Sequence, residues 1–148
     1  MSIMEVKIRK IKNSAIIPHK ATLNSAGYDL YACIDEPIMI HPHETVKIGT
    51  GLAIQPPEGY FGAIFARSGL ATKNGLRPAN CTGVCDEDYT GEYIVALHND
   101  CNEYSRVIKT GDRIAQLVFL PYINIDFCEV TELDKTERGD GGFGSTGK

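Results

Sequence analysis

The chain has 148 residues, of which 43% are hydrophobic and 23% charged, as in an ordinary single globular domain and unlike a disordered chain. Its net charge of −4 argues against a nucleic-acid polymer as the main partner, although a small phosphorylated ligand needs only a few local cations. We find no run of about eighteen apolar residues that could span a membrane and no signal peptide, so we expect no membrane partner.

Short apolar runs separated by Gly, Pro, Asn and Asp recur along the chain, and helical periodicity is nearly absent. This pattern predicts an all-β fold (a sandwich, jelly roll or barrel) with one short helix from Ser68 to Asn74. Ser68 is expected to cap that helix, and Gly75 to end it in the left-handed conformation. The predicted strands are 3–9, 28–33, 45–54, 60–65, 92–98, 105–109, 113–120 and 124–131, with a further strand ending near residue 85 and forming a hairpin with 93–97.

Polar residues interrupt this predicted β framework at four points. Arg67 and Ser68 lie where a strand gives way to the helix, whose N-terminus can bind an anion, although plain capping by Ser68 explains them as well. Asp86 lies between the end of an apolar strand and its turn, where partial burial could raise its proton affinity. Gln116 and Asp29 each lie within an apolar strand, so each either completes a structural hydrogen bond or faces a ligand.

The last fifteen residues have a different character. Five of the nine residues from 139 to 147 are glycine, and Phe143 is the single large apolar side chain of the segment. We therefore predict a β domain at 1–133 and a flexible arm at 134–148, which either binds phosphate through glycine N–H groups and Arg138 or stays a solvated tail. A P-loop match at Gly142, Gly147 and Lys148 fails, because no Ser, Thr or helix follows it.

The five cysteines are an odd number and include no C-x-x-C pair, which favours free thiols in a reducing cytoplasm. Cys81, Cys85 and His98 raise the question of zinc, but the second pair of ligands that a structural zinc site needs is missing. We therefore expect a cytoplasmic protein without zinc.

Five segments resemble the five motifs of the trimeric dUTPase family, in the family's order and spacing. They are AGYDLYA (26–32), ARSGLATKNGL (66–76), GVCDEDYTGEY (83–93), GDRIAQLVF (111–119) and RGDGGFGSTG (138–147). The resemblance implies a β jelly roll that hydrolyses dUTP to dUMP and pyrophosphate, and a homotrimer whose active sites are shared among the subunits. It also implies Mg²⁺ as cofactor, held by the triphosphate and by waters with no direct protein ligand.

The resemblance further implies a role for each matching residue. Asp86 corresponds to the general base that activates the attacking water, and Tyr89 to the residue beneath the deoxyribose. Phe143 corresponds to the aromatic side chain that covers the uracil, and Asp29 to a supporting acid near the sugar and the metal-bound water. Phosphate contacts are implied for Arg67, Ser68, Gly69 and Gln116, uracil contacts for Asn80, Gly83, Val84, Cys85 and Ile94, and a clamp on the distal phosphates for Arg138, Gly144, Ser145 and Thr146.

Two positions depart from the family pattern, since Ala66 stands where many members have proline and Thr90 where many have arginine. Two alternatives stay open at this point. One is a dCTP deaminase, an enzyme with the same fold, and the other is a regulatory binding module built on the dUTPase fold.

Overall fold

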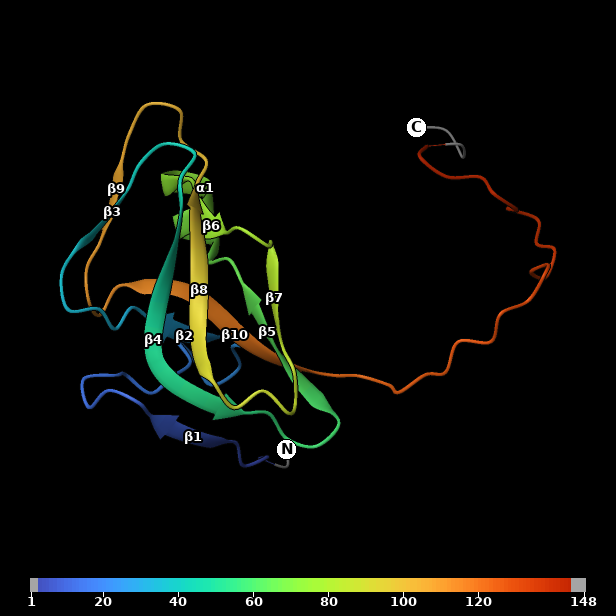
Figure 1. Ribbon diagram of the computed structural model, residues 1–148, viewed down its shortest axis with the longest axis horizontal. Helices are drawn as coiled ribbons and strands as arrows, with labels where there is room; N and C mark the ends of the chain where they lie inside the picture. Colours follow the sequence, from blue (N-terminus) through green and yellow to red (C-terminus); the bar gives the residue numbers. More distant parts are fainter. Residues whose placement is uncertain (1–2, 145–148) are drawn as a thin grey trace.

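The computed structural model describes residues 3–144, in which ten strands and one short helix form the secondary structure (Figure 1). Two four-stranded sheets have the orders β1-β4-β8-β6 and β2-β10-β5-β7, and β3 pairs with β9 in a separate ribbon. The mostly-β prediction is therefore confirmed. The elements are β1 (Lys7–Lys10), β2 (Tyr28–Tyr31), β3 (Ile38–Ile40), β4 (Thr45–Gln55), β5 (Tyr60–Phe65), α1 (Ser68–Asn74), β6 (Leu76–Pro78), β7 (Thr82–Cys85), β8 (Glu92–Asn99), β9 (Arg106–Ile108) and β10 (Arg113–Pro121).

One hydrophobic core lies between the two larger sheets. In β8 the side chains alternate, so that Tyr93, Val95 and Leu97 are buried while their neighbours are more exposed. The other sheet contributes Leu30 from β2 and Leu117 from β10 to the same cluster. Because each such side chain contributes about 1.5–3 kcal/mol when fully buried, this shared core holds the two sheets face to face.

The short helix α1 spans the predicted residues, and Gly75 ends it with φ 67°, as expected. The predicted cap is wrong. The N-cap position belongs to Arg67, whose backbone is extended, and no side chain makes a capping hydrogen bond. Ser68 is already the first helical residue, so its exposed hydroxyl lies one position too late to cap the helix.

The predicted strand at 124–131 is wrong. The last strand ends at Pro121, and the chain beyond it runs away from the body of the molecule without regular structure (Figure 1). Its apolar residues alternate as in a strand, but Ile123, Ile125 and Phe127 are all exposed. A strand needs a neighbour to accept its backbone hydrogen bonds, and this segment lies beside none of the strands that the structure describes.

Sequence reasoning missed the short strands β3 and β6, which have only three residues each. In the part of the chain that the structure describes, no helix has the length and apolar character that crossing a membrane requires.

Candidate functional site

A polar cleft of about 420 Å³ opens between the start of α1 and the strands β2 and β10. It brings together five residues that the sequence singled out from three separate motifs. They are Asp29, Arg67, Ser68, Gly69 and Gln116. One backbone feature, the start of α1, and three side chains that can donate hydrogen bonds therefore line one volume; the side chains are those of Arg67, Ser68 and Gln116.

Strand pairing explains why these motifs meet. β10 lies between β2 and β5, and Gln116 is opposite Asp29 on one side and Phe65 on the other. The Gln116 amide donates a hydrogen bond to the carbonyl of Ala66, at 2.9 Å, directly before Arg67. A Cβ on Gly27 would collide with the Gln116 side-chain oxygen, so a larger residue there would displace this amide. Gln116 thus completes a structural hydrogen bond and also faces the cleft.

Asp29 is held between two guanidinium groups. Arg67 Nε lies 2.9 Å from one carboxylate oxygen, and Arg113 Nη1 lies 3.3 Å from the other. The Asp29 side chain is 14% exposed, so these contacts are partly screened from water. Two cations and one anion leave the cleft with a net positive charge, which suits a phosphate-bearing ligand.

Sequence reasoning missed Arg113 as a lining residue of this cleft. In a regular strand, Arg113 and Gln116 would point to opposite faces because side chains alternate. The pairing of β10 with β2 has a register shift between Arg113 and Ala115, however, and such an irregularity changes the direction of the side chains beyond it. The charge was visible in the sequence, but the shift was not.

The second group of predicted residues surrounds the turn that joins β7 to β8. The predicted hairpin is wrong, because β7 pairs with β5 whereas β8 pairs with β4 and β6 in the other sheet. The carbonyl of Asp86 accepts the N–H of Tyr89 at 3.1 Å, and the Tyr89 hydroxyl donates to the carbonyl of Glu92 at 2.8 Å. The Tyr89 ring stacks on the buried Tyr93 with centroids 6.3 Å apart. A Cβ on Gly91 would lie 2.6 Å from the Tyr89 hydroxyl oxygen, so the ring folds back over its own turn only because residue 91 is glycine.

β7 is the outermost strand of its sheet, and β5 pairs with it on one side. The backbone of Gly83, Val84 and Cys85 therefore presents alternate N–H and C=O groups toward the unpaired side. Asn80 lies next to this edge strand, because its side-chain amide nitrogen would be 3.6 Å from a Cβ built on Gly83. Val84 and the Ile94 side chain of β8 are exposed, whereas Cys85 is buried.

Asp86 was expected to be partly buried. In the single chain it is exposed, so this expectation is wrong. Cys85 points into the core, and successive side chains of a strand point to opposite faces. The side chain of Asp86 consequently turns outward at the end of β7.

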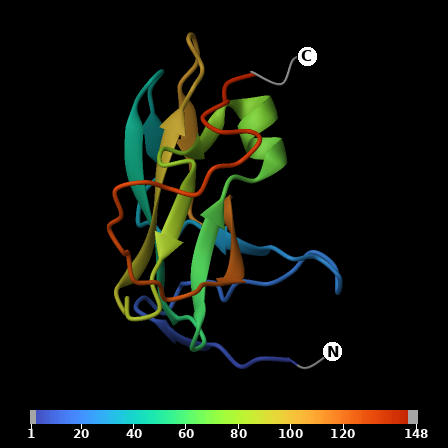
Figure 2. The ribbon, with the colours of Figure 1, turned by 90° about the vertical axis from the view of Figure 1, so that its right-hand side faces the viewer.

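The cleft and the turn between β7 and β8 lie at opposite ends of the β5–β7 pair. Cys85 is opposite Gly62, which puts Asp86 level with residue 61, six positions before Arg67. At about 3.3 Å per residue the two are roughly 20 Å apart. Both views show the same separation, with α1 at the top and the β7–β8 turn at the bottom (Figures 1 and 2).

The predicted arm residues that the structure describes are remote from both groups. Phe143 is fully exposed, and Arg138 Nε donates to the carbonyl of Gly141, at 2.8 Å, within the arm itself. Gly144 has φ 89°, a conformation that favours glycine. Ser145 and Thr146 lie outside the described residues.

Between residues 3 and 144, no group of three or more His, Cys, Asp or Glu side chains is placed to hold a metal ion. Mg²⁺ commonly keeps several waters and binds through substrate phosphates with one or two carboxylates nearby. The cleft offers that setting, because Arg67 and Ser68 suit phosphates and Asp29 provides a carboxylate whose oxygens can also accept hydrogen bonds from waters.

Comparison with known proteins gives one consistent result. A model of the dUTPase family matches residues 13–147. The chain is 49% identical over 150 residues to the deoxyuridine 5'-triphosphate nucleotidohydrolase of Desulfitobacterium hafniense, covering 99% of both proteins. It is 43% identical over 144 residues to the protein of the same name from a Hydrogenobaculum species, covering 97% of this chain and 99% of the relative.

Solved structures agree with the sequence relatives. The dUTPase of Staphylococcus bacteriophage 80alpha, solved with dUpNHpp, superposes with a TM-score of 0.83 at 28% identity, covering 97% of this chain and 99% of that one. A mutant dUTPase from phage phi11 of S. aureus, described with a coordinated structural Mg(II) ion, gives a TM-score of 0.79 at 26% identity, covering 89% of this chain and all of the other.

Proposed function

This chain belongs to the dUTPase family and is a dUTP diphosphatase, and we propose that it cleaves dUTP by attack of water on the α-phosphorus with Asp86 as general base. The observation that carries this proposal is that the candidate site has two chemically different parts. One part is a cationic cleft suited to phosphates, and the other is an edge strand that ends in an exposed carboxylate.

The edge strand β7 supports recognition of uracil. Its backbone N–H donors and C=O acceptors have fixed positions, whereas a side-chain amide can flip and exchange donor and acceptor. The strand can therefore hydrogen-bond with uracil and discriminate against cytosine, whose donors and acceptors are arranged differently. Asn80 lies beside Gly83 of this strand, and the Tyr89 ring, which stacks on Tyr93, offers a flat surface for the deoxyribose.

The cationic cleft supports binding of the triphosphate. Arg67 presents a guanidinium group, Ser68 a hydroxyl and Gly69 a backbone N–H, while Gln116 holds the carbonyl just before them. Mg²⁺ bound to the triphosphate would neutralise its charge, and Asp29 is placed to orient the surrounding waters. Positioning and charge stabilisation of this kind account for most catalysis of phosphoryl transfer.

We also propose a jelly-roll homotrimer in which each active site takes its parts from different copies. The roughly 20 Å between Asp86 and Arg67 in one chain is too long for a nucleotide's α-phosphate to reach both. The exposed apolar alternation at Ile123, Ile125 and Phe127 likewise suits pairing with another copy. Since all five cysteines are free thiols, we place this assembly in the cytoplasm.

The arm at 134–148 is proposed to close over the substrate, as a unit separate from the β domain at 1–133. Phe143 is a large aromatic side chain with no contact surface in its own segment, which suits stacking on a base. Truncation after Glu137 should leave the melting temperature nearly unchanged and lower kcat/KM at least about fivefold, because one base stack contributes about 1–3 kcal/mol. Unchanged kinetics would exclude the closing role.

The direct test incubates the purified chain with dUTP and dCTP separately and measures pyrophosphate and ammonia. Pyrophosphate from dUTP alone is expected, and ammonia from dCTP would identify a deaminase instead. Replacing Asp86 by Asn should lower kcat by about 10²–10⁴, since it removes the base. Asp88→Asn, in the same exposed turn, is the matched control and should keep the parent rate; equal rates in the two variants would remove Asp86 from the mechanism.

A further inference from the structure

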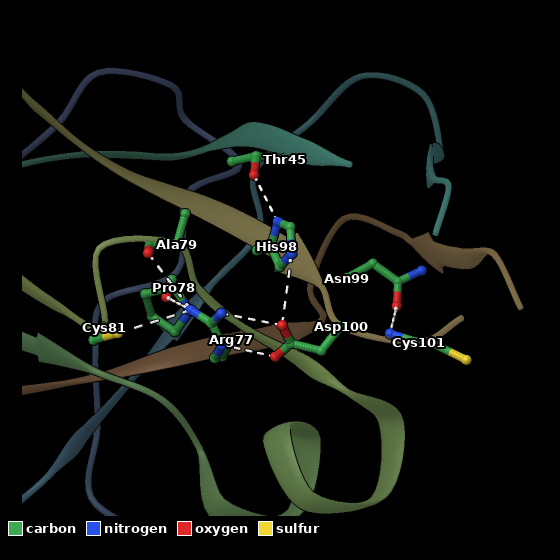
Figure 3. Close-up of polar contacts among 9 residues, drawn as sticks. All are labelled: Thr45, Arg77, Pro78, Ala79, Cys81, His98, Asn99, Asp100 and Cys101. Atoms are coloured by element: carbon green, nitrogen blue, oxygen red, sulfur yellow. Dashed lines mark hydrogen bonds and ion pairs between the residues drawn. The ribbon is translucent and has the colours of Figure 1, made fainter. Parts of the chain in front are cut away.

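A row of polar side chains crosses three strands at one level of the β1-β4-β8-β6 sheet. Thr45 of β4 is opposite His98 of β8, and His98 is opposite Arg77 of β6. His98 Nδ1 lies 2.8 Å from the Thr45 hydroxyl, and its Nε2 lies 3.5 Å from the carboxylate of Asp100 (Figure 3). Such cross-strand contacts hold neighbouring strands in register.

Arg77 makes a two-pronged contact with Asp100. Its Nε donates at 2.7 Å to one carboxylate oxygen and its Nη2 at 3.0 Å to the other (Figure 3). The Asp100 N–H in turn donates to the carbonyl of Gly75 at 2.8 Å, so the carboxylate belongs to a firmly held piece of backbone. A planar fork of this kind leaves the third guanidinium nitrogen with a defined direction.

That third nitrogen, Nη1, points to the turn between β6 and β7. It donates to the carbonyl of Pro78 at 3.1 Å and lies 3.5 Å from that of Ala79 and 3.8 Å from the sulfur of Cys81. The same Pro78 carbonyl accepts the Cys81 N–H at 3.0 Å, which closes the turn. Cys81 has φ 62°, a left-handed conformation that costs free energy in a residue other than glycine, so the turn needs outside support.

Asn80 is the residue that this turn presents. Its side chain is exposed and lies over Gly83 on the edge strand β7, where the proposed uracil contacts are. We propose that Arg77, held by Asp100, is a positioning residue that sets the Pro78–Cys81 turn and thereby the place of the Asn80 amide against the base. The inference rests on the proposed function, since it assigns this turn to recognition of uracil.

Lysine cannot replace arginine here. A single ammonium group can pair with Asp100 or approach the Pro78 carbonyl, but it lacks the rigid fork that does both at once. Arg77→Lys therefore keeps the charge pair between β6 and the end of β8 and releases the turn. A merely structural role for Arg77 would be rescued by lysine, whereas the positioning role would not.

The experiment measures kcat and KM for dUTP, kcat/KM for dCTP and the melting temperature of Arg77→Lys, Arg77→Met and Asp100→Asn. In both Arg77 variants we expect KM for dUTP to rise about tenfold and the preference for dUTP over dCTP to fall about tenfold, with kcat within about twofold; tenfold corresponds to one charge-assisted hydrogen bond. Asp100→Asn should shift KM in the same direction. Lys12→Met and Asp35→Asn, which break an exposed ion pair elsewhere on the surface, are the matched controls and should change neither value.

The outcomes separate the two proposals. Absence of pyrophosphate release from dUTP by the parent protein would refute the proposed function. An active parent whose Arg77→Lys and Asp100→Asn variants keep the parent KM and base preference would refute the positioning role, whatever happens to their melting temperatures. If Arg77→Met does not fold, these two milder variants decide the question. A loss confined to kcat would also count against the inference.

Discussion

Mixing two inactive variants tests whether one active site draws on two copies of the chain. Asp86→Asn removes the proposed base from the β7–β8 turn, and Arg67→Ala removes a guanidinium group from the cleft. The first should lower kcat by about 10²–10⁴. The second should lower kcat/KM by about 10- to 100-fold, because it removes a charged hydrogen bond to phosphate. Each variant alone should therefore release little pyrophosphate.

The distance between the two residues determines what mixing does. Asp86 and Arg67 are roughly 20 Å apart in one chain, so in the proposed trimer each site would take the β7–β8 turn of one copy and the cleft of another. In a randomly assembled equimolar mixture, such a site is intact when its β7–β8 turn comes from the Arg67→Ala chain and its cleft from the Asp86→Asn chain. The probability is one half times one half, so about one quarter of the parent activity should return.

The assay unfolds the two variants together, refolds them and measures pyrophosphate release per site. The control mixes Arg67→Ala with Gln116→Ala, which damage the same cleft, and should recover nothing because no chain then has an intact cleft. Activity of the first mixture no higher than the sum of the two separate variants would refute the reasoning, since it would mean that a single chain contains the whole site. Melting temperatures check that each variant folds, because Arg67 also pairs with Asp29.

Three further predictions follow from single contacts. Gly91→Ala should displace the Tyr89 ring, because the new Cβ would lie 2.6 Å from its hydroxyl oxygen, and should raise KM for dUTP with little loss of stability; parent kinetics would contradict the packing argument. Tyr93→Phe should raise the free energy of unfolding in urea by about 1 kcal/mol, because within residues 3–144 the buried hydroxyl makes no hydrogen bond of good geometry and has only the weakly bonding Cys85 thiol as a neighbouring partner; a decrease would show that this thiol contact stabilises the fold. Hydrogen bonds from Tyr122 and from a backbone N–H hold the pKa of Glu87 in the folded protein below its ordinary value of 4.5. The ionised Glu87 therefore stabilises the fold fully above pH 4.5, and this stabilisation is lost as the pH falls through the lowered pKa. Tyr122→Phe should flatten this acid dependence of the melting temperature below pH 4.5, and an unchanged slope would assign the effect to other groups.

Local patterns predicted most of the secondary structure because each depends on residues close together in the chain. The alternation of Tyr93, Val95 and Leu97 indicated β8 correctly, and Gly75 ended α1 as expected. The same reasoning failed at 124–131, where the alternation is present but the described chain provides no neighbouring strand. Ser68 failed as a cap because the helix already begins at Ser68, one residue earlier than it would if Ser68 were the cap.

The motifs identified the candidate site residues and the family before any coordinates, and their chemistry already pointed to a phosphorylated ligand. The spatial grouping required the tertiary structure. Asp29, Arg67 and Gln116 meet because β10 lies between β2 and β5, and Arg113 joins them through a register shift. Neither the pairing partners of a strand nor its irregularities can be read from local periodicity, because both depend on contacts between residues distant in sequence.

What the amino-acid sequence determined alone is therefore the list of elements and reactive groups, since propensity, alternation and turn residues act over a few positions. Only the tertiary structure decided that the proposed base Asp86 and the cationic cleft lie at opposite ends of the β5–β7 strand pair, and that Arg77 reaches from Asp100 to the turn that presents Asn80. Those relations arise when sheets pair and pack, because long-range contacts determine which side chains of separate segments come within hydrogen-bonding distance.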